Sequence, residues 1–378
     1  MPFNLGTSGI GSHPLNDPKR LIRDILESGI TYPYIPQLYS DEMTVQFHSM
    51  FPGIKILNGA SILDVNTPNF REKLEAFKDD LKFKTLLLRP HGMAVESDFV
   101  KELSVFSELL SESPTRPQGI KCQLVGPITE AASIRIHPGN TRLIDDPELL
   151  DLLVTLTAEI AHWLSGQLLQ IANSNKIQRS NVILFLDEPL FAFSIENQIP
   201  TKEVLEKIAQ VLQLIQCKKG IHICDNPVNV LNDILKIPVD LFSYDAIKYS
   251  NSLKNSDRDL IEDFVLRGGG FAFGLTPNTP ESVFGVERIP QIMTRELTPS
   301  EFFPTPDQLG QVLHKNILPL AQKGIPIQQL LAQSLITPSC GFRNFTIPTP
   351  EEGELMVKQL LQIQEKAAAN LRKTYELD

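Results

Sequence analysis

Cysteine, tryptophan and long apolar runs are scarce in this sequence. The chain of 378 residues has four cysteines and one tryptophan. Four cysteines are too few for a disulfide scaffold, so we expect reduced thiols. No apolar run approaches the ~18–20 residues of a membrane span. The first residues, Met1–Asn4, lack a basic region followed by an apolar core, so we expect no signal peptide. We therefore predict a cytoplasmic protein that does not bind a membrane.

An excess of basic charge is also missing. The chain carries 35 basic and 45 acidic residues, for a formal net charge of −10. A general nucleic-acid binder would need a basic surface, so we expect no nucleic-acid partner. Hydrophobic residues make up 42% of the chain. That share is enough to bury a core, which argues against extended disorder.

Short apolar or β-branched runs alternate with longer amphipathic stretches, a pattern typical of strands and helices. We predict strands at 6–10, 31–36, 120–125, 181–186, 220–224, 239–244, 270–274 and 334–338. Eight strands alternating with helices predict an α/β fold, a (β/α)8 TIM barrel, as one domain over residues 1–378. A doubly wound open sheet is the alternative. We find no glycine-rich phosphate loop of the usual kinds that would favour it.

Helix starts and one long connection are also marked in the sequence. A capping side chain precedes a proline at four places, a pattern typical of a helix N-terminus. These are Asp17-Pro18, Asp146-Pro147, Thr305-Pro306 and Thr349-Pro350. Apolar spacing predicts a long helix over 147–172. The region 276–305 is rich in Pro, Thr and Glu, so we expect a long loop after the seventh strand that acts as a lid.

Histidine, cysteine and carboxylate side chains fall at three predicted strand ends. His222 and Cys224 are two residues apart on one strand, so their side chains point the same way. Asp245 ends the next strand, and Cys340 follows the eighth. Parallel strand ends converge in a barrel, and this donor set favours zinc. The structural alternative is a packed histidine with buried apolar thiols.

Two acids and a small-residue turn mark further strand ends. Asp187 and Glu188 follow a strongly apolar strand. Buried together, they need a cation, a proton or hydrogen-bond donors, and the alternative is a helix or turn cap. Ser12 lies in the turn Gly9–Pro14, where small residues let backbone amides approach a ligand. These residues are candidates for binding a small-molecule substrate.

In order, these strand ends resemble the catalytic barrel of cobalamin-independent methionine synthases. That barrel belongs to a superfamily with uroporphyrinogen decarboxylases and the zinc methyltransferases that serve corrinoid proteins. The similarity covers nearly the whole chain. It rests on the ordered series Ile10-Gly11-Ser12, Val125–Thr129, Leu186–Pro189, His222–Cys224, Asp245 and Pro338–Gly341.

The resemblance implies roles for the metal-binding candidates. His222, Cys224 and Cys340 match the zinc ligands of the family, and Zn2+ is the implied cofactor. Asp245 falls where the family has a glutamate as fourth ligand. A shorter carboxylate is still able to bind zinc.

The resemblance also implies how a substrate is held. Ser12 matches a residue that holds the carboxylate of homocysteine, and Asp187 matches one that holds its amino group. Glu188, next to it, belongs to the same matched segment. The family has a second acid for the amino group, but the best-matching position here is Gln37. Gln37 has no charge, which weakens the match to an amino-acid acceptor.

The implied activity is transfer of a methyl group to a zinc-activated thiol, with homocysteine the leading acceptor. The long synthases carry an additional N-terminal domain for methyl-folate, for which we expect no room here. The donor is then a methylated corrinoid protein or methyl-folate. One alternative is a corrinoid-protein methyltransferase with a coenzyme M-like thiol or a folate as acceptor. Others are a metal-free decarboxylase of tetrapyrrole carboxylates, which would need a cluster of basic residues, and a non-catalytic zinc-stabilised barrel.

Overall fold

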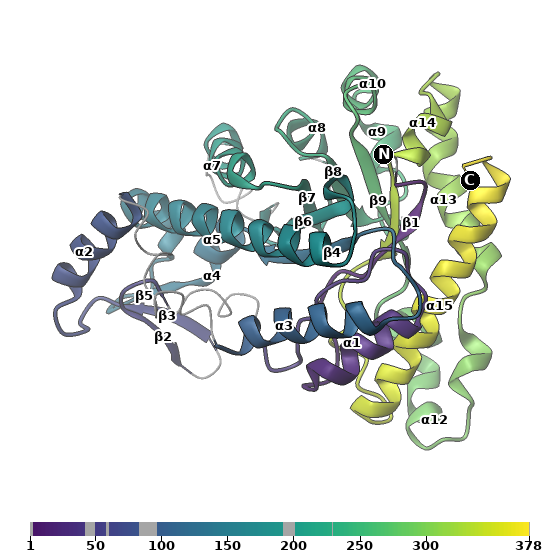
Figure 1. The fold of residues 1–378 in the computed structure, drawn as a ribbon, viewed down its shortest axis with the longest axis horizontal. Helices are drawn as coiled ribbons and strands as arrows, with labels where there is room; N and C mark the ends of the chain where they lie inside the picture. Colours follow the sequence, from purple (N-terminus) through teal and green to yellow (C-terminus); the bar gives the residue numbers. More distant parts are fainter. Residues whose placement is uncertain are drawn as a thin grey trace.

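A curled parallel sheet forms the centre of the molecule (Figure 1). The computed structural model describes residues 3–41, 50–57, 60–82, 97–191, 201–228 and 230–377. The sheet has seven strands in the order β1-β10-β9-β8-β7-β6-β4, and all neighbours are parallel. Their bounds are β1 (Gly6–Thr7), β4 (Ile120–Val125), β6 (Val182–Asp187), β7 (Lys218–Ile223), β8 (Leu241–Asp245), β9 (Gly270–Thr276) and β10 (Leu335–Pro338).

The predicted second strand, at 31–36, is wrong, and with it the closed eight-stranded barrel. The seven strands form a half-barrel between the edges β1 and β4. The segment 31–36 lies between these two edges: the N–H of Tyr32 donates to Thr7 of β1 (2.8 Å) and the N–H of Ile35 donates to Lys121 of β4 (3.2 Å). It forms an isolated bridge to Lys121 and no strand of its own. Pro33 and Pro36 explain the failure, because proline has no N–H to donate to a strand ladder.

Both faces of the sheet are buried, which is why its strands are nearly continuous apolar runs. On β6, Ile183 and Phe185 point to the inner face, and Leu184 and Leu186 to the helices. The inner face carries a small apolar cluster of Phe3, Tyr32, Ile183, Phe185, Leu241, Ala272 and Leu335. This cluster forms the apolar part of the inner face.

Helices cover the outer face of the sheet (Figure 1). They include α1 (Pro18–Glu27), α3 (Ser97–Glu112), α4 (Pro127–Ser133), α5 (Pro147–Ser174), α7 (Thr201–Leu214), α8 (Leu231–Ile234), α9 (Ser252–Asn255), α10 (Arg258–Leu266), α13 (Pro306–Gln322), α14 (Ile327–Ala332) and α15 (Pro350–Thr374). The four predicted starts are confirmed, since each capping side chain accepts a hydrogen bond from the first turn of its helix. The long predicted helix is α5, two residues longer than expected.

A second, smaller sheet escaped the sequence analysis. It has three strands, β2 (Ile54–Leu57), β3 (Ala60–Asp64) and β5 (Arg135–His137), and α2 (Phe70–Lys82) follows β3. β2 runs antiparallel to β3, while β5 is parallel to it. Most side chains of β2 and β5 are exposed or half-buried. In the sequence, however, Ile54–Leu57 and Ala60–Asp64 flank the pair Asn58-Gly59, a hairpin signal that the sequence analysis did not use.

The segment after β9 is packed against the body of the protein and is not an open loop. It contains the short helices α11 (Pro280–Phe284) and α12 (Ile289–Met293) and the 3-10 turns η4 (Val286–Arg288) and η5 (Pro299–Phe302). Phe284 and Ile292 are buried in an apolar cluster with residues of α1 and α15. Helix formation and burial together fix a segment that the composition indicated as irregular.

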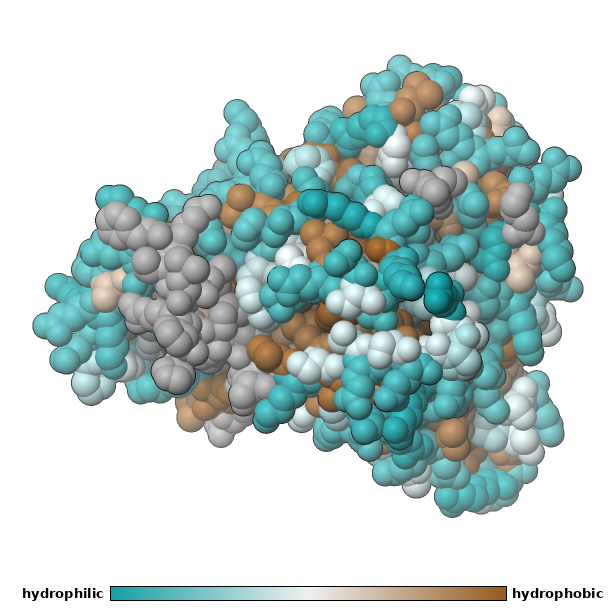
Figure 2. All heavy atoms as spheres, viewed as in Figure 1, coloured by the Kyte–Doolittle hydropathy of each residue, from teal (hydrophilic) through white to brown (hydrophobic). Residues whose placement is uncertain are grey.

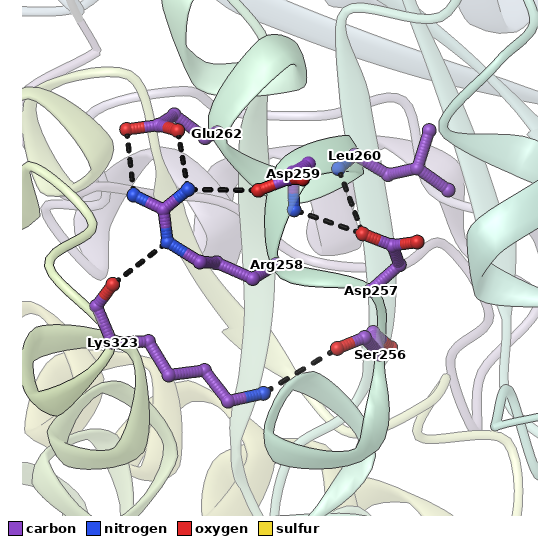
Figure 3. Close-up of polar contacts among 7 residues, drawn as sticks. All are labelled: Ser256, Asp257, Arg258, Asp259, Leu260, Glu262 and Lys323. Atoms are coloured by element: carbon purple, nitrogen blue, oxygen red, sulfur yellow. Dashed lines mark hydrogen bonds and ion pairs between the residues drawn. The ribbon is translucent and has the colours of Figure 1, made fainter.

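Polar contacts join the outer helices to one another. Arg258 at the start of α10 donates from Nε to the carbonyl oxygen of Lys323, which ends α13, at 2.9 Å (Figure 3). Its other nitrogens bind both carboxylate oxygens of Glu262.

Hydrophilic residues cover most of the face in Figure 2, with apolar ones mainly in its middle. Within the described ranges, none of the helices has the length and apolar character needed to cross a bilayer.

Candidate metal and substrate site

Three predicted metal ligands come together at the carboxyl ends of the strands. His222 lies on β7, Cys224 directly follows that strand, and Cys340 follows β10. One ligand atom from each lies within 4.8 Å of the other two. β8 and β9 separate β7 from β10, so it is the curl of the sheet that brings these ends together. The predicted juxtaposition of these residues is present.

His222 is oriented by a residue that sequence analysis missed. Its side chain is buried, and its Nδ1 lies 2.9 Å from Oγ of Ser243 on β8, its direct neighbour in the strand register. Its Nε2 is buried and has no hydrogen-bond partner among the described residues. If Nδ1 donates to Ser243, the lone pair of Nε2 is available for a metal, the usual arrangement of a ligating histidine. Side chains alternate along a strand, so Ser243 and Asp245 lie on the same face. That pattern could have identified Ser243 as a site residue from the sequence.

The thiols of Cys224 and Cys340 lie close enough to change each other's pKa. The neighbouring Cys224 thiol and the His222 ring lower the pKa of Cys340 well below its usual range. The same contact with Cys340, together with burial, raises the pKa of Cys224. The pair therefore holds one negative charge more readily than isolated thiols would. Two sulfurs and one imidazole form a donor set that suits zinc.

Asp245 lies beside this cluster, but its carboxylate is engaged locally. Oδ1 accepts hydrogen bonds from the backbone N–H groups of Ile247 (3.0 Å) and Lys248 (2.9 Å). Burial raises its pKa, and these two hydrogen bonds oppose that shift. Asp245 is not part of the three-ligand group described above. Its place as a fourth ligand stays a prediction.

Asp187 points an unengaged oxygen into the same region. It ends β6, stands beside His222 in the strand register, and is 9% exposed. Its Oδ1 is buried without a hydrogen-bond partner in the described part of the chain. Burial raises its pKa to about 6, although His222 and Lys121 act in the opposite direction. An unpaired carboxylate oxygen is well suited to accept a hydrogen bond from a ligand.

Glu188 has a different environment from its neighbour. It is fully buried, and its two oxygens accept from the backbone N–H groups of Ile128 (3.1 Å) and Thr129 (2.7 Å) at the start of α4. Burial raises its pKa to about 7, and the hydrogen bonds from Thr129 and Ile128 oppose that shift. A Cβ at Gly126 would lie 2.1 Å from Oε1, so a larger residue there would displace the Glu188 side chain. These contacts favour the helix-cap interpretation, and a substrate contact for Glu188 stays a prediction.

Ser12 and Gln37 form an isolated bridge beside the turn that carries Cys340. The carbonyl oxygen of Ser12 accepts from the N–H of Phe342 at 2.8 Å. A Cβ on Gly341 would lie 1.9 Å from Ser12 Oγ, so the turn and the Ser12 side chain are in close contact. Nε2 of Gln37 donates to the carbonyl oxygen of Asp41 at 3.3 Å. The structure thus brings Ser12 next to the Cys340 turn, with Gln37 beyond it.

Lys121 on β4 is a buried cation that sequence analysis did not single out. Its Nζ donates to the carbonyl oxygen of Ile10 and, at 3.1 Å, to Oε1 of Gln123. It also lies 5.3 Å from the centre of the Phe185 ring. Burial lowers its pKa to about 8, and the charge of Asp187 acts against that shift. The sequence signal that could have identified Lys121 is a lysine within the otherwise apolar run of β4.

Comparisons with known proteins give the site a family context. No protein-family model matches the chain. Over 274 residues it is 23% identical to the methionine synthase of Methanothermobacter thermautotrophicus, covering 72% of this chain and 74% of that protein. The chain is a homologue of methionine synthase.

Solved structures extend the likeness over almost the whole chain. A B12-independent methionine synthase from Shewanella sp. W3-18-1, in complex with selenomethionine, superposes with a TM-score of 0.57 at 14% identity and 98% coverage of both chains. A methyltransferase from Methanosarcina mazei gives a TM-score of 0.51 at 11% identity, over 96% of this chain and 94% of that one. At such low identity these two likenesses concern the fold. They agree with the family that the sequence motifs indicated.

Proposed function

We propose that this methionine synthase homologue is a zinc-dependent methyltransferase that methylates the sulfur of a small thiol, with homocysteine the leading acceptor and methionine the product. The observation that carries the proposal is the cluster of His222, Cys224 and Cys340, with a buried, unpartnered histidine nitrogen beside two thiols. The sequence relative supports the reaction class, because it is a methionine synthase.

The residues fit a bound zinc ion. An orphaned imidazole nitrogen costs free energy in a buried site, and a metal would satisfy it. Zinc prefers tetrahedral nitrogen and sulfur ligands, and three protein ligands leave a position for a substrate. A zinc ion held by His222, Cys224 and Cys340 would lower the pKa of a substrate thiol, so that a nucleophilic thiolate is present at neutral pH. Ser243 keeps the His222 ring oriented for this task.

The remaining polar residues would orient the acceptor. Asp187 offers an unpaired carboxylate oxygen to the amino group of homocysteine, and the Ser12 hydroxyl would donate to its carboxylate. Lys121 favours the ionised form of Asp187. Its hydrogen bond to Ile10 also ties down the chain two residues before Ser12. These residues would hold the sulfur in line with the donor methyl group.

A second acceptor class deserves a parallel test, because Gln37 favours it. Gln37 is neutral where the family has an acid, so an ammonium group on the acceptor gains less attraction here. A coenzyme M-like thiol or a folate would then be the acceptor. The proposed donor in either case is a methylated corrinoid protein or methyl-folate.

Metal content is the first test. Untagged protein purified without added metal would be analysed by inductively coupled plasma mass spectrometry beside Cys340→Ala and, as a matched control, Cys217→Ala. Cys217 lies outside the three-ligand cluster. We expect zinc near one equivalent in the wild type and the control, and a loss in Cys340→Ala. A wild-type protein that neither contains nor takes up zinc would refute the proposal.

Substrates are the second test. The zinc-loaded protein would be given methylcobalamin or methyl-tetrahydrofolate as donor, with homocysteine or with a thiol of the same length that lacks the amino group. We expect methylation of homocysteine to be faster, with product quantified by mass spectrometry. A preference for the amine-free thiol would instead favour the second acceptor class.

A further inference from the structure

Asn278 clamps the turn that carries Cys340. It lies two residues after β9, within the segment predicted to be a loop. Its Nδ2 donates to the carbonyl oxygen of Gly341 at 2.9 Å. Its Oδ1 accepts from Oγ of Ser339 at 2.8 Å. One side chain thus holds the residues immediately before and after Cys340.

From this geometry we infer that Asn278 is a positioning residue for Cys340, and that the segment after the seventh predicted strand thereby sets the metal site. The inference rests on the proposed metal site. It adds a residue to which neither the sequence motifs nor the comparisons gave a role.

The orientation of the Asn278 amide follows from its partners. The carbonyl oxygen of Gly341 can only accept, so the nitrogen of the amide must face it. The amide oxygen then faces Ser339, whose hydroxyl must donate. Both arms of the amide are therefore used, and the neighbours leave no freedom to flip it. Replacing either arm removes one defined hydrogen bond.

Backbone contacts hold the rest of the same turn. The N–H of Ser339 donates to Thr276 (2.9 Å), and that of Phe342 to Ser12 (2.8 Å). β9 approaches closely as well, because a Cβ on Gly274 would lie 2.8 Å from the Cα of Ser339. These contacts fix the two ends of the turn. The Asn278 side chain spans the part between them, where Cys340 lies.

Asn278 itself is carried by a packed segment. Six residues further on, Phe284 is buried, with its ring centre 6.1 Å from that of Phe345. Phe345 in turn lies 6.1 Å from Phe342, at the end of the Cys340 turn. Polar and apolar contacts thus join the segment to the same turn. A side chain fixed in this way can set the direction of a ligand, as outer-shell residues of metal sites do.

Cobalt binding would test the inference with a spectroscopic readout. Metal-free wild type, Asn278→Ala and Thr279→Ala would be titrated with Co2+, followed by visible absorption and by competition with a chelator. Thr279→Ala is the matched control, since Thr279 lies next to Asn278 and its hydroxyl hydrogen-bonds to Ser282, capping α11 in the same segment. We expect Asn278→Ala to bind Co2+ about 10- to 100-fold more weakly, with shifted d–d bands. The control should match the wild type.

Two further variants separate the arms and protect the test against misfolding. Ser339→Ala removes one hydrogen bond, and Asn278→Asp keeps the acceptor but loses the donor. We expect both variants to weaken Co2+ binding. The loss in Ser339→Ala should be smaller than the loss in Asn278→Ala. Folding would be checked by circular dichroism, and if Asn278→Ala does not fold these two variants decide.

The outcomes distinguish the two proposals. Wild-type affinity and spectrum in all three variants of the clamp would overturn the role of Asn278 while leaving the metal site intact. An equal loss in Thr279→Ala would also overturn it, because general loosening of the segment would then explain the effect. A wild type that binds no Co2+ would refute the metal site and the inference together.

Discussion

At the residue scale, the surroundings of Nε2 of His222 distinguish a metal-binding histidine from one that is only packed in the core. The sequence left both interpretations of His222 open. In a packed histidine both ring nitrogens would find partners, but here Nδ1 faces Ser243 while Nε2 has none among the described residues. Two thiols from distant parts of the chain lie next to it. This pairing of an oriented ring with an unsatisfied nitrogen favours the ligand.

The charge of Asp187 predicts a pH effect on acceptor choice. Its pKa is raised to about 6, so the carboxyl is ionised above that pH and becomes neutral below it. As the pH falls from 7.5 to 5.5, we expect the KM for homocysteine to rise several-fold relative to that of an amine-free thiol. The ratio cancels effects of pH on the metal ligands. Steady-state kinetics with both thiols would measure it, and Asp187→Asn should abolish the change in ratio.

In Lys121→Met, we expect the rise in KM for homocysteine to begin at a higher pH than in the wild type. Lys121 favours the charged form of Asp187, so losing its ammonium should raise the pKa of Asp187 and shift the rise in KM to higher pH. The carbonyl of Ile10 also loses a donor, which should cost about 1–3 kcal/mol of folding free energy. The same kinetic ratio and urea unfolding would measure the two effects. An unchanged pH profile would contradict the assigned electrostatic contact.

At the element scale, backbone termini account for residues that resembled substrate ligands. Glu188 follows Asp187 directly, yet its oxygens satisfy the first N–H groups of α4. Neighbouring residues on a strand point to opposite faces, so the two acids meet different surroundings. From the sequence, Asp187 and Glu188 could each either bind a ligand or cap a helix. The sequence could not assign these roles, because the cap depends on where α4 begins in space.

Close packing of α15 predicts an unusual cost for a glycine substitution. A Cβ on Gly353 would lie 1.7 Å from the carbonyl oxygen of Phe345, so Gly353→Ala forces the backbone apart. Alanine improves helix propensity by about 1 kcal/mol, but overpacking of this kind costs about 1–3 kcal/mol or more. We expect a net loss of stability by chemical denaturation.

Gly310 supplies the opposite case as a control. It lies inside α13, and its nearest neighbour to an added Cβ is Leu371 at 3.7 Å, an ordinary contact. We expect Gly310→Ala to stabilise the protein by about 0.4–1 kcal/mol. If both substitutions changed stability in the same direction, the packing argument for Gly353 would fail.

At the scale of the whole molecule, the proposed metal site joins distant parts of the sheet. β8 and β9 lie between the strand of His222 and the strand before Cys340, and the two residues are more than a hundred positions apart in sequence. A ligand that binds only the folded state stabilises it, by about 2.7 kcal/mol at a concentration 100 times its Kd.

We therefore expect the thermal unfolding midpoint to fall when zinc is removed. Differential scanning calorimetry of zinc-loaded and chelator-treated protein would measure the change. Cys340→Ala supplies the control, since chelation should have little effect on its midpoint. Equal midpoints for the two wild-type forms would argue against a metal shared by these strands.

Seven strands and the long helices were predictable because their signals are local. A strand buried on both faces reads as an apolar run, and a capped helix begins at a recognisable pair such as Asp146-Pro147. The failures also have local causes. The prolines near Tyr34 prevent the eighth strand, and the missed strands β2 and β3 flank an Asn-Gly pair whose hairpin signal was not used. The order of the strand-end motifs was enough to indicate the family.

The sequence by itself determined the order of the elements, the residue types at the strand ends and the resemblance to methionine synthases. Hydrophobic periodicity and helix capping depend on residues that are close in the chain, so they can be recognised from the sequence alone. Only the tertiary structure decided which strand ends meet, that Glu188 caps a helix, that Ser243 contacts His222, and that Asn278 holds the turn of Cys340. Those contacts join residues from different strands and loops. They come within hydrogen-bond distance because the sheet curls, and the spacing of residues along the chain does not encode that curvature.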